Sequence, residues 1–342
     1  MLNLEPHKHN VMRQIYGIDL SKKKLDISFI DKNGFLQHKV IDNNIAKITR
    51  LMEQLSVNSV LCAEHTGAPG NLLRFLAHIK KVPVILVTGY EVKHGLGLIK
   101  GKSDKIDSDR IREYAERFYD KLNFAVFEGE CLFELQELHS LRNQLVKQRK
   151  MLETQCCGKE LNPFNSIAAN RIARSQISKL NEDIKDLEKE MASILANDHE
   201  LKQNLELVTS VKSIGPVTAT ELIVKTRNFT KIKTAKKAAS FAGVCPFPNA
   251  SGQMVKKSKV SPMSDRSLKS LLYMCSCSAV KHNKEYKLYY QQKLMEGKPY
   301  FLIMNNIANK LLRTVFSIIE SRIPWDPNYI CVDPRMREKI VV

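Results

Sequence analysis

The stretch IYGIDLSKKKLDISFIDKNGFLQHKVI, residues 15–41, predicts how the fold begins. It contains three apolar runs, and each run is short enough to form a β-strand. The second and third runs are separated by DKNG, whose Asn33-Gly34 pair favours the tight turn of a β-hairpin. The stretch therefore predicts three consecutive strands, at 15–20, 25–30 and 35–41.

Helical and strand patterns alternate over the next eighty residues. SVLCAE at 59–64 and VPVILVT at 82–88 are apolar runs typical of buried strands. Between and after them lie segments with helical spacing of apolar residues. This alternation predicts an α/β layer with a mixed sheet. The expected helices are at 45–55, 70–81 and about 103–118.

Long helices are predicted between residues 131 and 197. Apolar residues from Ile177 to Ile194 step by three and four, which is a heptad pattern. CCGKELNPFN at 156–165 interrupts the pattern and predicts an antiparallel helical hairpin. This arm is interpreted as a packing element or a dimer contact, and a homo-oligomer, either dimer or tetramer, is expected.

The last third of the chain predicts a mainly helical domain. Around Ile214-Gly215, two apolar helices are joined either by a phosphate-contacting hairpin or by an ordinary turn. Amphipathic helices are expected at 267–280 and 301–321. The predicted fold is α/β plus α, with an RNase H-like mixed-sheet domain, a coiled-coil arm and a helical domain. The expected boundaries are 14–125, 131–200 and 201–322, with a tail at 323–342.

Composition narrows the class of partner. The 342 residues include 54 Lys and Arg against 36 Asp and Glu, a formal charge of +18. Such an excess favours a polyanion, nucleic acid or an acidic membrane face. There is no run of 18 apolar residues and no apolar signal core at the N-terminus, so a cytoplasmic protein without membrane segments is expected. The eight cysteines show no repeated CxxC spacing and are interpreted as reduced thiols.

Carboxylates follow two of the predicted strands and begin one helix. Asp19 and Glu64 follow apolar runs, while Asp104 and Asp107 are spaced to share one helix face. Oxygen clusters of this kind bind Mg²⁺ or Mn²⁺, and two such ions stabilise phosphodiester displacement. Repulsion among the carboxylates would raise some of their pKa values without a metal. Four other acids are interpreted as solvated or turn residues: Asp26, Asp31, Asp42 and Asp109. Three lysines near the predicted helix are interpreted as phosphate contacts: Lys100, Lys102 and Lys105.

Three motifs resemble those of the DEDD transposases, the insertion-sequence family 110/1111. They are GIDLSKKKLD at 17–26, CAEHTG at 62–67 and KSDKIDSDRI at 102–111. In the last motif Ser108 replaces the family's usual alanine, a change from one small residue to another. The resemblance implies a RuvC-like N-terminal domain whose acidic tetrad falls on Asp19, Glu64, Asp104 and Asp107.

The resemblance continues into the C-terminal half, where SFAGVCPFPNASG at 240–252 is similar to a family block ending in Ser-Gly. It implies that Ser251 is a nucleophile and that a structured noncoding RNA encoded by the element is a partner. From its sequence context alone, Ser251 would be a turn residue. The basic stretch after it supplies candidate contacts to a scissile phosphate: Lys256, Lys257 and Lys259.

Three functions follow from these observations. The first is a DNA transposase that uses both the acidic tetrad and the serine. The second is a metal-dependent Holliday-junction-type endonuclease that needs the acids and forms no covalent intermediate. The third is a noncatalytic nucleic-acid binder, which four acids in a basic protein disfavour. Tyrosine-recombinase chemistry is set aside, because no His-x-x-Arg motif accompanies the late tyrosines.

Overall fold

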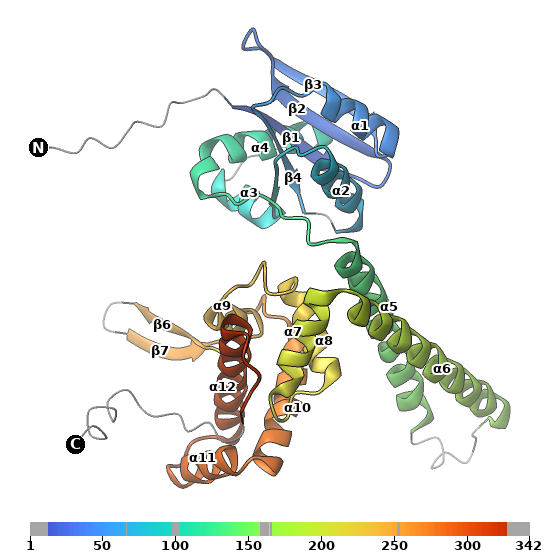
Figure 1. The fold of residues 1–342 in the computed structure, drawn as a ribbon, viewed down its shortest axis with the longest axis vertical. Helices are drawn as coiled ribbons and strands as arrows, with labels where there is room; N and C mark the ends of the chain where they lie inside the picture. Colours follow the sequence, from blue (N-terminus) through green and yellow to red (C-terminus); the bar gives the residue numbers. More distant parts are fainter. Residues whose placement is uncertain are drawn as a thin grey trace, which may run out of the picture. The chain divides into compact units, whose positions relative to one another are not determined.

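The computed structural model describes residues 13–65, 67–97, 103–157, 164, 166–251 and 254–326. The chain divides into two compact units, Met1–Phe127 (unit 1) and Glu128–Val342 (unit 2). Unit 1 is a mixed α/β layer, and unit 2 is mainly helical (Figure 1). The predicted combination of an α/β part with a helical part is therefore confirmed.

Unit 1 is built on a five-stranded sheet with the strand order β3-β2-β1-β4-β5. The first three strands pair in antiparallel fashion, whereas β1–β4 and β4–β5 pair in parallel, which makes the sheet mixed as predicted. The strands are β1 (Gln14–Leu20), β2 (Lys24–Ile30), β3 (Leu36–Asp42), β4 (Ser59–Glu64) and β5 (Val84–Val87).

Helices cover both faces of the sheet, because alternate strand residues are apolar on each face. The side chain of Ile18 lies on one face of the sheet, and the apolar residues of that face pack against α1 (Ile45–Glu53) and α2 (Asn71–Ile79). Ile15 and Cys62 lie on the other face, with α3 and α4. The bounds of these last elements and of two short 3₁₀ turns are α3 (Gly89–Gly95), α4 (Asp104–Arg117), η1 (Ala68–Gly70) and η2 (Tyr119–Lys121).

A glycine brings α4 close to the central strand. A Cβ added to Gly17 would lie 2.2 Å from the backbone oxygen of Ser108 and 2.4 Å from the backbone nitrogen of Arg112. No side chain fits that space, and Ser108 itself is fully buried. The glycine of the GID motif and the small residue of the third motif thus allow this helix to pack tightly on β1.

Unit 2 contains eight helices and one two-stranded hairpin among its described residues. Its core is formed mainly by α7, α8, α10 and α12, with the first turns of α5 and the last turns of α6. The elements are α5 (Glu130–Cys156), α6 (Ile167–Asn197), α7 (His199–Ser210), α8 (Pro216–Thr226), α9 (Ala235–Phe241), β6 (Phe247–Ser251), β7 (Met254–Lys259), α10 (Arg266–His282), α11 (Lys284–Met295) and α12 (Tyr300–Ser321).

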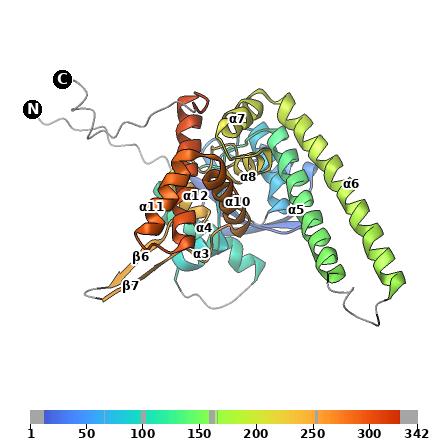
Figure 2. The same cartoon turned by 90° about the horizontal axis from the view of Figure 1, so that it is seen from below.

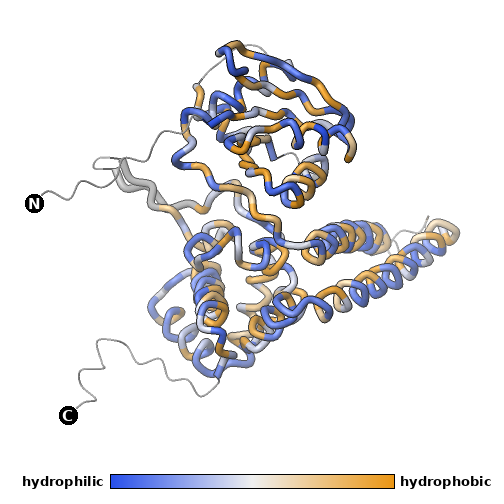
Figure 3. The backbone as a smooth tube through the Cα atoms, turned by 45° about the horizontal axis from the view of Figure 1, so that its top comes forward, coloured by the Kyte–Doolittle hydropathy of each residue, from blue (hydrophilic) through white to orange (hydrophobic). Residues whose placement is uncertain are grey.

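The predicted helical hairpin is formed by α5 and α6, which lie side by side (Figure 2). Arg142 contacts Glu188 at 2.6 Å and Arg149 donates to Asn181 at 2.9 Å, so contacts run in opposite directions along the two helices. Hydrophobic residues alternate with hydrophilic ones along both helices (Figure 3). Of the heptad positions, Ile184 and Met191 are buried within the chain, and α5 packs along α6, so part of the seam is already covered. Among the described helices, none is long and apolar enough to span a membrane.

Candidate metal centre

Asp19 and Glu64 lie at the same edge of the sheet. The parallel register pairs Ile18 with Ala63, so the residues that follow, Asp19 and Glu64, are neighbours on adjacent strands. Both belong to the face that α4 covers, because their side chains alternate with those of Ile18 and Ala63. Gly89 leaves room for Glu64, since a Cβ at this position would lie 2.6 Å from Glu64 Oε1.

The other two acids belong to the first turn of α4. Ser103 begins this helix by accepting a hydrogen bond from the Ile106 N–H, as N-cap residues do. Asp104 and Asp107 follow, where the positive end of the helix dipole favours carboxylates. The close packing of α4 on β1 therefore brings this turn to the sheet edge that carries Asp19.

The electrostatics of Asp19 show that these acids interact. Burial, followed by the charges of Asp104, Asp107 and Glu64, raises the pKa of Asp19 from 3.8 to about 6. The predicted mutual repulsion therefore contributes to the raised pKa of Asp19. A group of acidic oxygens whose repulsion is not fully balanced fits a divalent cation, which would lower the free energy of their ionised forms.

Basic side chains form ion pairs with two of the acids. Lys24 Nζ lies 2.7 Å from Asp104 Oδ2, and Arg110 lies 3.2 Å from Asp107 Oδ1. Within the described ranges no three His, Cys, Asp or Glu side chains already form a ready metal site. Asp104 has a side chain that is 56% exposed, so its carboxylate is accessible from solvent.

Of the acids interpreted as solvated, Asp26 proves to be part of this region and Asp109 is held by other side chains, so that interpretation was wrong for both. Asp26 is 8% exposed, lies opposite Asp19 in the β1–β2 register and contributes to the raised pKa of Asp19. Asp109 accepts a hydrogen bond from Ser28 and lies 3.3 Å from His38 Nε2. Asp31 is a turn residue as predicted, because it accepts the Asn33 and Phe35 N–H groups.

The structure describes only some of the residues that were predicted to contact nucleic acid. Lys105 is exposed on α4. Ser251 ends β6, opposite Met254 of β7, so it belongs to a strand of a β-hairpin rather than to a loop. Lys100 and Lys102 lie outside the described residues. Three further predicted contacts belong to strand β7, but their side chains lie outside the described part of the chain: Lys256, Lys257 and Lys259.

Comparison with known proteins identifies the class. A transposase model of the DEDD IS110 type matches residues 16–158, and a model of the transposase IS116/IS110/IS902 family matches residues 205–291. Both models describe transposases, so each half of the chain gives the same class of enzyme. The chain belongs to the IS110 family of DEDD transposases.

Individual relatives agree with this membership. The chain is 24% identical over 327 residues to the pilin gene-inverting proteins of Moraxella lacunata and Moraxella bovis, covering 91% of this chain and 97% of each relative. It is also 24% identical over 152 residues to an insertion element IS116 uncharacterized 44.8 kDa protein of Streptomyces clavuligerus. That match covers 44% of this chain and 37% of the relative. The chain is thus an enzyme of DNA transposition and recombination, in a class that is typically dependent on divalent metals.

Proposed function

We propose that this transposase cuts and rejoins DNA strands with two groups, the acidic tetrad of unit 1 and the Ser251 hydroxyl of unit 2. The observation that carries the proposal is the placement of the acids: Asp19 and Glu64 follow paired residues of adjacent parallel strands, and the first turn of α4, which packs on β1, bears the other two. Unit 1 is proposed to be RuvC-like, with the domain boundaries expected from the sequence. The proposed metal ligands are Asp19, Glu64, Asp104 and Asp107.

The tetrad is proposed to hold Mg²⁺ or Mn²⁺. When bound, such an ion neutralises charge that develops on the phosphodiester oxygens during strand exchange. Glu64 and Asp19 supply oxygens from rigid strands, and the first turn of α4 supplies the rest. Asp26 is proposed as an auxiliary acid, which keeps the local charge negative and orients Lys24.

Ser251 is proposed to form a covalent ester with DNA. Its oxygen attacks the phosphorus, a phosphoserine ester forms, and the bond from phosphorus to the leaving DNA oxygen breaks. The serine proton ends on the departing strand as its hydroxyl. A second DNA hydroxyl reverses these bond changes, so strands are rejoined without an external energy source. The serine and the acids must meet at one phosphate in the complex with DNA.

The relatives favour rejoining over simple nicking. Two of them are named as pilin gene-inverting proteins, and inversion of a gene requires that cut strands be joined again. We further propose a structured noncoding RNA as the guide and a homo-oligomer as the active form. The support for these partners is the family resemblance, the +18 charge and the helical arm.

Trapping of a covalent adduct tests the serine. With a nicked suicide DNA substrate, the wild-type chain is expected to form an adduct whose peptide, mapped by mass spectrometry, contains Ser251. Ser251→Ala should bind the same DNA and form no adduct, and Ser258→Ala is the matched control on the neighbouring strand. An adduct on a tyrosine, or nicking by Ser251→Ala at the wild-type rate, would favour a metal-dependent endonuclease without a covalent step.

A further inference from the structure

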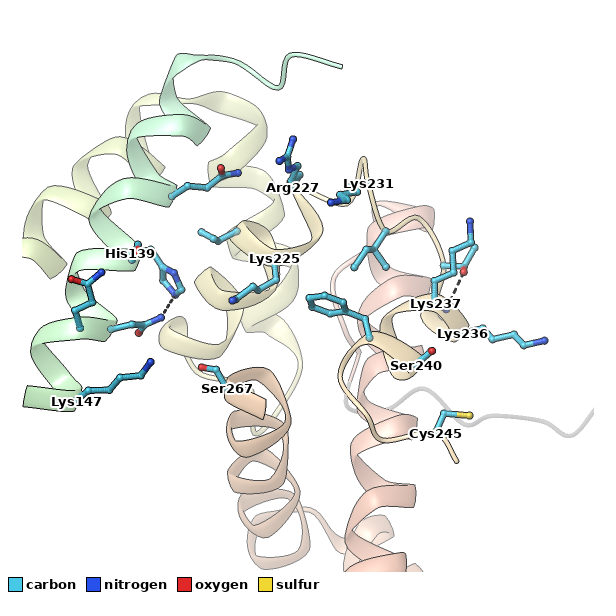
Figure 4. Close-up of a pocket in the computed structure, with 18 of the residues that line it drawn as sticks. His139, Lys147, Lys225, Arg227, Lys231, Lys236, Lys237, Ser240, Cys245 and Ser267 are labelled. Carbon is cyan, nitrogen blue, oxygen red and sulfur yellow. Dashed lines mark hydrogen bonds between the residues drawn. The ribbon is translucent and has the colours of Figure 1, made fainter. Parts of the chain in front are cut away.

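A basic cavity in unit 2 lies between α5, the end of α8 and α9 (Figure 4). Its volume is about 1220 Å³, and among the described residues that line it none is acidic. Six lining residues are lysine or arginine, and they come from segments up to ninety positions apart in the chain. These residues are Lys147, Lys225, Arg227, Lys231, Lys236 and Lys237.

Acids beneath the cavity balance only part of this charge. Lys225 lies 2.9 Å from Asp265, and Arg227 lies 2.9 Å from Glu128. By contrast, three lining lysines form no ion pair within the described part of the chain. The cavity therefore carries positive charge that its own surroundings do not cancel, and the three lysines responsible are Lys147, Lys236 and Lys237.

The floor of the cavity is fixed by a buried polar contact. His139 Nε2 lies 2.7 Å from Glu221 Oε2, and the two side chains are only 6% and 2% exposed. Burial raises the pKa of Glu221, but the hydrogen bond and charge of His139, together with Lys225, outweigh it, and the pKa is lowered. The ionised glutamate thus anchors both His139 and Lys225 at the cavity.

One wall is formed by a strained turn. Arg227, Asn228 and Phe229 all have positive φ, at 51°, 51° and 61°, a conformation that disfavours residues other than glycine. Buried contacts maintain it: Asn204 donates to Asn228 at 2.7 Å, and the Phe229 ring contacts Phe316 with centroids 5.3 Å apart. Strain held in place by such contacts is typical of functional sites. Here the turn places Arg227 and, four residues later, Lys231 on the same wall of the cavity.

Apolar side chains lie next to these cations. Ile232, Phe241 and Phe247 line the same cavity, and Phe247 is 46% exposed. Basic grooves combined with aromatic side chains bind single-stranded nucleic acid, because the cations contact phosphates while unstacked bases pack on the rings. A duplex keeps its bases stacked and leaves such rings unused. The volume also exceeds the range of about 300–1000 Å³ usual for small-molecule sites.

We propose that this cavity binds a single-stranded nucleic-acid segment, with its lysines on consecutive phosphates and Phe247 against a base. The proposal rests on the chain acting on nucleic acid, but not on the metal centre or Ser251. Its test is fluorescence anisotropy with labelled 20-mer DNA and RNA strands of mixed sequence, on the full chain in EDTA, so that no cleavage chemistry is required.

The first variant removes the three lysines without acidic partners, as Lys147→Gln/Lys236→Gln/Lys237→Gln. Because each phosphate contact contributes about 0.7 to the slope of log K against log salt concentration, affinity should fall about 100-fold in 0.1 M salt and the slope by about 2. The matched control, Lys281→Gln/Lys284→Gln/Lys287→Gln, removes the same charge from α10 and α11. Screening should limit its effect to about threefold.

Phe247→Leu tests the aromatic contact. It should weaken strand binding by about tenfold while leaving the salt slope unchanged, because a stacked base and not a phosphate is lost. Fluorescence of Trp325, which packs in unit 2, checks that each variant is folded. A preference for DNA or for RNA would identify the sugar that the cavity accepts, and either preference supports the proposal.

Several results would overturn it. They are equal losses in the two lysine triples, unchanged binding by the cavity triple, or duplex DNA competing as well as single strands. Failure of this inference is distinguishable from failure of the catalytic proposal. A chain that binds strands through the cavity yet forms no Ser251 adduct would contradict only the catalytic proposal.

Discussion

Replacing Asp19 with asparagine is expected to stabilise the metal-free chain while it abolishes strand cleavage. The pKa of Asp19 is raised from 3.8 to about 6, first by burial and then by the charges of Asp104, Asp107 and Glu64. A carboxyl group with a raised folded-state pKa favours the folded state at low pH, and that contribution is lost as pH rises through 6. Asparagine has the same shape and cannot ionise.

The magnitude follows from the size of this pKa change. A difference of about two units corresponds to roughly 3 kcal/mol at pH 8, and partial solvent screening reduces the expected gain to about 1–3 kcal/mol. At pH 4.5 the gain should shrink to about 1 kcal/mol or less, because Asp19 is then mostly protonated in the folded state. Saturating Mg²⁺ should reverse the order, since it stabilises the wild-type chain by about 4.1 kcal/mol at a thousandfold excess over its Kd.

The assay must measure the stability of unit 1 separately from that of unit 2. Trp325 is the one tryptophan of the sequence and packs in unit 2, so its fluorescence does not monitor unit 1. Urea-dependent hydrogen exchange of peptides covering β1 and β4 gives the free energy of unfolding of the sheet. Asp31→Asn is the opposite control: the Phe35 backbone N–H and then the Gln37 side-chain amide donate to Asp31 and lower its pKa, so this variant should lose stability at pH 8. A destabilised Asp19→Asn chain, or a gain equal at both pH values, would refute the reasoning.

Further predictions concern packing, charge and assembly. Gly17→Ala should push α4 away from β1, lower the melting temperature of unit 1 and reduce Mg²⁺ binding, as measured by calorimetry, because a Cβ would lie 2.2 Å from a backbone oxygen. Lys24→Gln should tighten Mg²⁺ binding in the same calorimetric assay, since it removes the cation that contacts Asp104; unchanged affinity would contradict this competition. Leu180→Asp/Leu187→Asp should shift the chain toward monomer in light scattering, and an unchanged mass would assign the arm to packing within the chain. DNA affinity should fall steeply between 50 and 200 mM salt, by about a thousandfold for six phosphate contacts, and a flat response would exclude a phosphate-binding surface.

Local patterns in the sequence were sufficient to predict most elements of unit 1. Apolar runs and the Asn33-Gly34 turn predicted the strands, and Asp104 was predicted at the start of its helix. The failure at Asp26 has a physical cause. In β2, Leu25 and Ile27 face one layer while Asp26 and Ser28 face the other, so an alternating strand usually exposes its polar face to water. Here α4 covers that face, which strand periodicity alone does not reveal.

Contacts between distant segments were beyond prediction. Lys24 and Asp104 are separated by 80 positions, and only the packing of α4 on the sheet brings them together. The basic cavity likewise combines α5, α8 and α9, each of which looks like an ordinary amphipathic or basic helix by itself. Residue type and spacing along one segment therefore predict candidate ligands, whereas the cations that compete for them depend on tertiary structure.

The chain has a formal charge of +18, yet several of its acids lie together at one edge of the sheet. Its basic and acidic residues therefore have different electrostatic roles. Lysines and arginines elsewhere attract the phosphate backbone at long range. At the sheet edge, Asp19 and its neighbours are held together against their own repulsion by the rigid packing of Gly17 against α4. Lys24 contacts Asp104 and Arg110 contacts Asp107, so these two cations offset part of that repulsion. Binding of a divalent cation at these acids would relieve that repulsion, which is the electrostatic basis for the metal centre proposed above.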